Sequence, residues 1–72
     1  MDEYEVRFYY YDKDGYLEYS YEPFGDNKEE AWDYFRRQEP TKHHPYIKLY
    51  GTYEYEEDGR WLIDEYLIDE KG

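Results

Sequence analysis

The chain has 72 residues, no cysteine, and a formal net charge of −11 from 20 acidic and nine basic side chains. This length fits one domain with a small core, and without cysteine neither a disulfide nor a thiolate metal site can form. No apolar run reaches the length of a membrane span, and Met1 precedes charged residues rather than a signal segment. We therefore expect a single domain, residues 1–72, of a cytoplasmic protein that does not contact a membrane.

The charge and the aromatic content indicate a folded, acidic protein and limit the functions it can have. So many like charges favour disorder, but 13 Tyr, three Phe and two Trp supply bulky material for a folded core. A net charge of magnitude roughly 2 to 8 keeps a small domain soluble. The larger charge of this chain favours a role beyond solubility, and its negative sign disfavours direct binding to nucleic acid.

Residues 3–22 predict a β-hairpin, because apolar side chains alternate along two segments that flank a turn. One side of residues 3–11 carries Tyr4, Val6, Phe8 and Tyr10, and one side of residues 16–22 carries Leu17, Tyr19 and Tyr21. The segment from Asp12 to Gly15 has the composition of a tight turn. With residues 12–15 as the loop, Tyr10 faces Leu17 and Val6 faces Tyr21, so the apolar sides of both strands coincide.

Residues 26–38 predict a helix that follows Pro23 and Gly25. Asp26 or Asn27 can cap its N-terminus, with a glutamate at the spacing of a capping box. Ala31, Trp32 and Phe35 form its apolar stripe, while the charged positions of the same segment face water. Pro40 and Pro45 bound the loop that follows.

Residues 46–68 predict a second hairpin. Residues 57–59 have the composition of a three-residue loop, which pairs Tyr55 with Trp61 and Tyr53 with Ile63, all facing the core. Residues 69–72 are expected to fray. The order ββαββ predicts an α+β fold, with a four-stranded, mostly antiparallel sheet and one helix packed on one face.

One helix leaves the other face of the sheet open, and the predicted registers assign carboxylates and apolar side chains to it. The expected acidic set is Glu3, Glu5, Glu18, Glu22, Glu54, Glu56 and Asp64, with Glu57 and Asp58 in the adjoining loop. The expected apolar set is Tyr9, Tyr11, Tyr16, Tyr50, Leu62, Tyr66 and Ile68. Glu5 is expected directly opposite Glu22, a like-charge pair that costs stability and so favours a functional face. The alternative is a solvated face, since tyrosine favours strands and charge protects sheet edges.

The acidic rows predict mimicry of DNA. Alternate glutamates on one side of a strand lie about 6.6 Å apart, and alternate phosphates of one DNA strand advance about 6.8 Å along the helix axis. A protein that binds DNA through Lys and Arg would accept such a surface, while the tyrosines pack on its apolar surface. The alternative is a homodimer formed through the same tyrosine and leucine side chains.

Motifs for catalysis, cofactors and metals are not found. Asp12 to Gly15 does not match a calcium loop, because Tyr10 and Tyr21 stand where acidic ligands belong. His43 and His44 have no obvious third ligand for a metal. We therefore expect no enzyme activity, no catalytic residues, no cofactor and no metal.

In length, charge, exposed tyrosine and glutamate-rich strands such as YEYEEDG, the chain resembles the small acidic DNA-mimic proteins of bacteriophages. Proteins of that class inhibit the histone-like nucleoid protein HU, uracil-DNA glycosylase, restriction enzymes or CRISPR nucleases. The segment DKDGYLEYSYE also resembles the first hairpin of a Bacillus phage glycosylase inhibitor. The resemblance implies an inhibitor of a basic DNA-binding protein in the cytoplasm of a host bacterium. HU is the favoured target, because it contacts mostly DNA backbone and shape.

Overall fold

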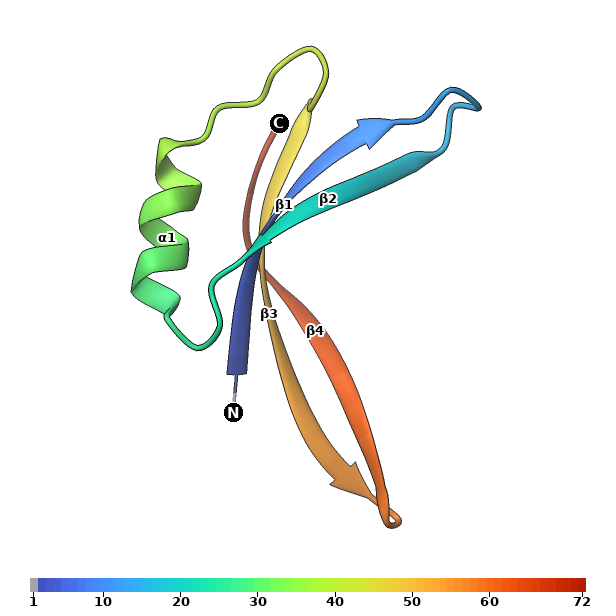
Figure 1. Cartoon of the computed structure of the whole chain (residues 1–72), viewed down its shortest axis with the longest axis vertical. Coiled ribbons are helices and arrows are strands. Elements are labelled where there is room, and N and C mark those ends of the chain that lie inside the picture. The colour runs from blue at the N-terminus through green and yellow to red at the C-terminus, as the bar shows by residue number, and fades with distance from the viewer. Residues whose placement is uncertain (1) are drawn as a thin grey trace.

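The computed structural model describes residues 2–72, which form four strands and one helix in the order ββαββ (Figure 1). The first hairpin consists of β1 (Asp2–Tyr11) and β2 (Leu17–Pro23), and it is followed by α1 (Lys28–Arg37). The second hairpin consists of β3 (Tyr46–Glu57) and β4 (Arg60–Lys71). The strands form one antiparallel sheet in the order β2-β1-β3-β4, with α1 on one face, which confirms the predicted α+β fold.

The core between α1 and the sheet is small. Ala31 and Phe35 of α1 pack on Val6 of β1 and on Ile47 and Leu49 of β3, and all five side chains are buried. Half-buried aromatic residues of the sheet and helix surround this cluster. The core thus lies under the two central strands, where one helix can cover it.

The side chain of Asn27 caps the start of α1. The Oδ1 atom of Asn27 accepts a hydrogen bond from the backbone N–H of Glu30 at 3.0 Å, and the Asn27 Nδ2 donates to Glu30 Oε2 at 3.1 Å. Asn27, the second of the two predicted caps, is therefore the one used.

The prediction that residues 69–72 fray is wrong, because β4 continues to Lys71. The Nζ atom of Lys71 donates hydrogen bonds to the backbone carbonyls of Phe35, Arg36 and Gln38 at 2.9, 3.0 and 2.8 Å. A helix leaves its last carbonyls without partners in its own backbone. Lys71 therefore caps α1 and ties the end of β4 to it.

The register of the first hairpin differs by one residue from the prediction. Tyr9 pairs with Tyr19 and Val6 pairs with Glu22, because the loop extends from residue 12 to 16. The Asp12 carboxylate holds this longer loop by accepting hydrogen bonds from the N–H groups of Asp14 and Tyr16, both at 2.9 Å. A shift of one residue moves every side chain of β2 to the opposite face.

The second hairpin is also shifted by one residue, since its turn has two residues rather than three. Asp58 and Gly59 both have positive φ, 50° and 76°, as a type I′ turn requires. Glu57 consequently pairs with Arg60. A β-bulge beside Leu49 and Tyr50 then leaves Ile68 as an extra residue of β4, and Ile68 packs against the core.

The molecule is thin and elongated. Its extents are 44 × 31 × 15 Å and its radius of gyration is 13.8 Å, compared with about 11 Å for a compact domain of this length. Figure 1 shows that the β3–β4 hairpin projects well beyond α1, away from the splayed β1–β2 hairpin. Within residues 2–72, no helix is long and apolar enough to cross a membrane.

Candidate partner-binding surface

The face of the sheet opposite α1 is called the open face here, and the observed pairings define its side chains. Residues paired across antiparallel strands share a face, and Val6, Ile47 and Leu49 identify the α1 side. The open face carries Glu3, Glu5, Arg7, Tyr9, Tyr11, Leu17, Tyr19, Tyr21, Pro23, Tyr46, Lys48, Tyr50, Thr52, Glu54, Glu56, Trp61, Ile63, Glu65, Leu67 and Glu70. Seven residues expected there are present: Glu3, Glu5, Tyr9, Tyr11, Tyr50, Glu54 and Glu56.

Other expected residues lie on the α1 side, and their predicted placement on the open face is wrong. They are Glu18, Glu22, Leu62, Asp64, Tyr66 and Ile68. All six move because both hairpin registers shift by one residue. Tyr16, also expected on the open face, lies instead in the loop between β1 and β2. Glu5 pairs with Pro23 instead of Glu22, so the expected like-charge pair does not form.

Arg7, which was not among the predicted site residues, occupies the centre of the open face with only 4% of its surface exposed. Its Nε donates to Glu5 Oε2 at 2.6 Å and its Nη2 to Glu65 Oε1 at 2.7 Å. The guanidinium lies between the rings of Tyr19 and Tyr50, with centroids 4.5 and 3.9 Å from Cζ. Burial lowers the pKa of Arg7, but the hydrogen bonds to Glu65 and Glu5 outweigh it and raise that pKa above its ordinary value.

The tyrosines around Arg7 form a layer that covers the middle of the open face. Tyr9 is buried, and its ring lies 5.2 Å from that of Tyr19 and 5.0 Å from the Lys48 ammonium. Burial, with the neighbouring Tyr9 hydroxyl, raises the pKa of Tyr50. Tyr9 and Tyr50 therefore stabilise the fold at this point, and Glu5 is neutralised by Arg7. Tyr9 is buried and Glu5 and Tyr50 are half-buried, so all three side chains make their main contacts within the chain.

The open face is exposed at its β1–β2 end and, at the other end, on the projecting β3–β4 hairpin. There Glu54 pairs with Ile63 and Glu56 pairs with Trp61, and we call these four residues the hairpin strip. Trp61 and Ile63 are 70% and 65% exposed. Glu3 lies beside the hairpin strip, because it pairs with Thr52 of β3.

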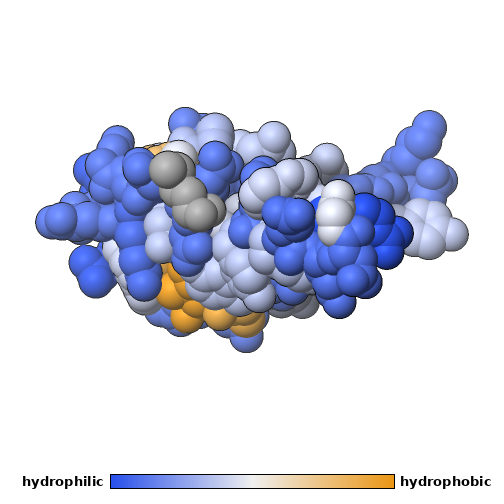
Figure 2. Space-filling model, turned by 90° about the horizontal axis from the view of Figure 1, so that it is seen from below, coloured by the Kyte–Doolittle hydropathy of each residue, from blue (hydrophilic) through white to orange (hydrophobic). Residues whose placement is uncertain are grey.

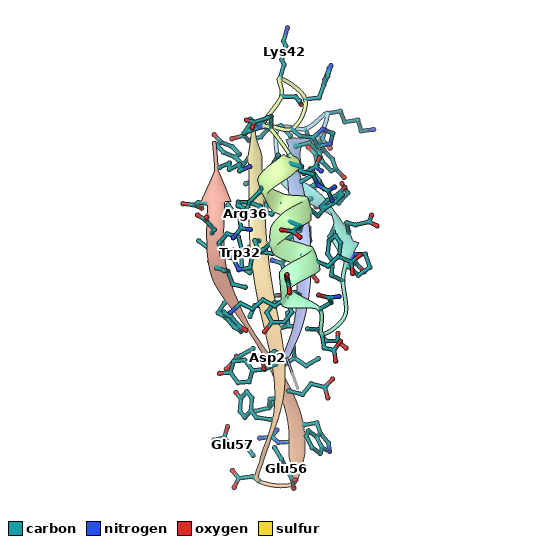
Figure 3. All side chains as sticks on the ribbon, turned by 90° about the vertical axis from the view of Figure 1, so that its left-hand side faces the viewer. Asp2, Trp32, Arg36, Lys42, Glu56 and Glu57 are labelled. Atoms are coloured by element: carbon teal, nitrogen blue, oxygen red, sulfur yellow. The ribbon has the colours of Figure 1, made fainter. Side chains whose placement is uncertain are left out.

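Charge is distributed unevenly along the molecule. Residues 52–65 carry Glu54, Glu56, Glu57, Asp58, Asp64 and Glu65 against the single base Arg60. In Figure 3, Glu56 and Glu57 lie at the far end of the long axis from Lys42. Figure 2 views the molecule from the hairpin end and shows mostly hydrophilic residues, with a small hydrophobic patch at one margin. The acidic hairpin is thus well separated from Lys42 and the loop that follows α1.

The loop that follows α1 is held against the sheet by His44. The N–H of His44 donates to Thr41 Oγ1 at 3.0 Å, and its ring meets the edges of Phe8 and Tyr10 at 6.2 and 6.0 Å between centroids. Among residues 2–72, no three His, Asp or Glu side chains gather in a way that could hold a metal ion. The contacts of His44 with the rings of Phe8 and Tyr10 give this histidine a role in packing the loop on the sheet.

Comparisons with protein-family models, with curated proteins and with solved structures find no match to this chain. The resemblance to phage DNA mimics therefore stays a prediction. A functional proposal depends on the acidic hairpin, its exposed apolar residues and the charge of the molecule.

Proposed function

We propose that this protein is a DNA mimic that occupies the DNA-binding surface of a basic protein and blocks its binding to DNA. The observation that carries the proposal is the projecting β3–β4 hairpin with its excess of carboxylates. A surface that substitutes for a duplex must be accessible from outside and rich in regularly spaced negative charge. The hairpin extends past α1, so its side chains can enter a groove or cleft of a partner.

The spacing of the carboxylates supports the proposal. Glu54 and Glu56 alternate on one side of β3, which separates them by about 6.6 Å, close to the roughly 6.8 Å between alternate phosphates. Glu57 and Asp58 continue the negative charge to the tip. Glu3 adds a carboxylate from the neighbouring strand, diagonal to Glu54 at about 7–8 Å.

The favoured partner is a histone-like nucleoid protein of the HU type in a bacterial cytoplasm. Such proteins contact mainly the DNA backbone, through Lys and Arg, with little reading of bases. An acidic surface can copy those contacts without copying base edges. Uracil-DNA glycosylase, restriction enzymes and CRISPR nucleases are alternative targets, because they also bind the phosphate backbone.

A competition assay tests the proposal. Purified HU is bound to a fluorescent DNA duplex at low salt, and this protein is added until the duplex is released. We expect release at low salt, where screening is weak and the exposed carboxylates attract the basic surface of HU most strongly. Failure to release the duplex at low salt would overturn HU as the target, and the same assay with uracil-DNA glycosylase would test the alternative.

Matched variants locate the competing surface. One variant neutralises the hairpin through Glu54→Gln, Glu56→Gln, Glu57→Gln and Asp58→Asn. The control neutralises the same amount of charge elsewhere through Asp14→Asn, Asp26→Asn, Glu29→Gln and Glu39→Gln. We expect the hairpin variant to compete at least about tenfold less well than the control. Equal losses would show that only net charge matters, and hairpin mimicry would be wrong.

A second candidate is a homodimer formed through the β1–β2 end of the open face. Tyr11, Leu17 and Tyr21 are exposed there and form an apolar surface, of the kind that often marks an interface. Leu62 and Tyr66, which we expected in such an interface, lie on the α1 side. Sedimentation should then show a dimer that resists high salt and dissociates in the Tyr21→Glu variant.

A further inference from the structure

Two large apolar side chains protrude from the most acidic part of the molecule. Trp61 and Ile63 are 70% and 65% exposed on the hairpin strip, far from the core under α1. A protein that needed only negative charge at this hairpin would gain solubility from polar residues at both positions. Exposed apolar residues within a polar surface often mark a binding site.

The pairing of the strands places each of these side chains beside a carboxylate. Trp61 lies directly opposite Glu56, and Ile63 directly opposite Glu54, on the same face of the sheet. Side chains at directly opposed positions have Cβ atoms about 5 Å apart. The hairpin strip is therefore two parallel columns, one of carboxylates on β3 and one of apolar side chains on β4.

A shallow hollow extends this arrangement toward β1. It has a volume of about 190 Å³ and is lined by Glu3, Thr52, Tyr53, Glu54 and Ile63. Two carboxylates and a hydroxyl group thus lie beside an apolar wall. Lysine and arginine have the matching structure, since an apolar stem leads to a charged head that forms hydrogen bonds.

Other occupants fit the hairpin strip less well. A second copy of this chain would place its own Glu54 and Glu56 near the same carboxylates, and the like charges would repel. A neutral apolar segment would desolvate the glutamates without a compensating partner. A chain that carries charge alone would leave Trp61 and Ile63 in water.

We propose that the hairpin strip docks a cationic amphipathic segment of its partner, with an apolar side along Trp61 and Ile63 and Lys or Arg heads on Glu54 and Glu56. One of these cationic side chains enters the hollow beside Glu3. This inference deepens the proposed function and rests on it, because it names the part of the basic partner that is recognised. Trp61 also offers a ring face on which a guanidinium can stack.

Two synthetic peptides of equal length and equal positive charge test the proposal. One spaces lysine, arginine and leucine to form an amphipathic helix, and the other replaces every leucine with serine. Binding of each fluorescent peptide to the full chain is measured by anisotropy at low and high salt. We expect the amphipathic peptide to bind about tenfold more tightly and to keep this advantage at high salt. Equal affinity for both peptides would overturn the proposal.

Variants test whether the tighter binding of the amphipathic peptide depends on the hairpin strip. Trp61→Ala and Ile63→Ala should remove the advantage of the amphipathic peptide, whereas Tyr16→Ala, which removes an equally exposed aromatic side chain at the other hairpin, should preserve it. Glu54→Gln together with Glu56→Gln should weaken the binding of both peptides and make their affinities depend less on salt. Because Trp61 and Ile63 are outside the core, these variants should unfold at the temperature of the parent.

The two proposals can fail separately. If the chain displaces DNA from HU and Trp61→Ala displaces it equally well, the mimicry stands and the amphipathic docking is wrong. If the chain prefers the amphipathic peptide and does not displace DNA from any of the proposed targets, the docking surface stands and the DNA-mimic function is wrong.

Discussion

Arg7 places a guanidinium in a sheet face that no helix among residues 2–72 covers. A buried charge needs both partners and packing, and here Glu5 and Glu65 supply the partners while the rings of Tyr19 and Tyr50 supply the packing. Tyrosine suits this position, since its ring packs on the cation and its hydroxyl can reach water. Part of the high tyrosine content is thus explained by Arg7 and needs no functional reason.

Replacing Arg7 with methionine should be strongly destabilising. The variant keeps the packing of the stem but leaves Glu5 and Glu65 without their shared cation. We expect the free energy of unfolding to fall by about 3 kcal/mol, the lower end for a broken buried pair because Glu65 is half exposed. Urea denaturation measures this change. The variant with Glu5→Gln and Glu65→Gln added should recover part of the loss, and a stable single variant would contradict the role of Arg7.

The hydroxyl of Tyr66 predicts a pH dependence of stability. It donates a hydrogen bond to Asp2 Oδ2 at 2.7 Å, and this bond, with burial, raises the pKa of Tyr66 above its ordinary value. A raised pKa in the folded state stabilises the protein below the unfolded pKa of about 10. This contribution is lost as pH rises through the folded pKa.

The Tyr66→Phe variant isolates that contribution. At pH 7 we expect the free energy of unfolding of the variant to be about 1 kcal/mol lower than that of the parent, as for the loss of a single hydrogen bond. The difference should shrink as pH rises above about 10. Tyr66 then ionises in the unfolded parent, which lowers the free energy of unfolding of the parent but not of the variant. Urea denaturation of both proteins over this pH range measures it, and a constant difference would show that Tyr66 is not linked to pH.

At the scale of elements, alternation predicts the four strands but not how they pair. Tyrosine occurs on both sides of β1 and β3, so the pattern of aromatic residues does not single out one register for either hairpin. The registers depend instead on loop length, which Asp12 sets in one hairpin and the positive φ of Asp58 in the other. The hydrogen bonds of Asp12 and the backbone conformation of Asp58 are local details, and the alternation of apolar and polar residues does not predict them.

The same shift decides how much of the candidate surface could be found from the sequence. Glu3, Glu54 and Glu56 belong to β1 and β3, whose alternation was assigned to the correct faces. Trp61 and Ile63 of β4 were expected in the core and lie outside it. A two-residue turn at Asp58-Gly59, a common hairpin signal, would have placed both correctly.

The cap that Lys71 forms on α1 gives a prediction at this scale. Lys71→Met removes three hydrogen bonds to carbonyls at the helix end, along with a favourable charge at the C-terminus of α1. We expect a loss of about 1–2 kcal/mol in unfolding free energy, within the range for helix caps. Lys13→Met changes the same charge at an exposed turn and should have little effect. Equal effects in thermal unfolding would contradict the cap.

At the scale of the whole molecule, a small core must hold together a chain of charge −11. A thin sheet with one helix buries few apolar side chains, so mutual repulsion of the carboxylates weighs heavily against folding. The same repulsion acts in the acidic hairpin, which makes few contacts outside β3 and β4. The negative charge that favours binding to a basic partner therefore lowers the folding stability of the free protein.

This conflict predicts opposite effects of salt on folding and on binding. Sodium chloride screens the repulsion within the chain and should raise the free energy of unfolding by roughly 1 kcal/mol, which for a domain of this size raises the melting temperature by about 4–8 °C. Over the same range, binding to HU should weaken, because salt also screens the attraction. Scanning calorimetry measures the thermal effect, and titration of HU with this protein in the absence of DNA measures the effect on binding. The hairpin variant with Glu54, Glu56, Glu57 and Asp58 neutralised should show a smaller thermal gain, since less repulsion remains to be screened. A melting temperature that falls with salt would mean that ion pairs such as those of Arg7 outweigh the repulsion.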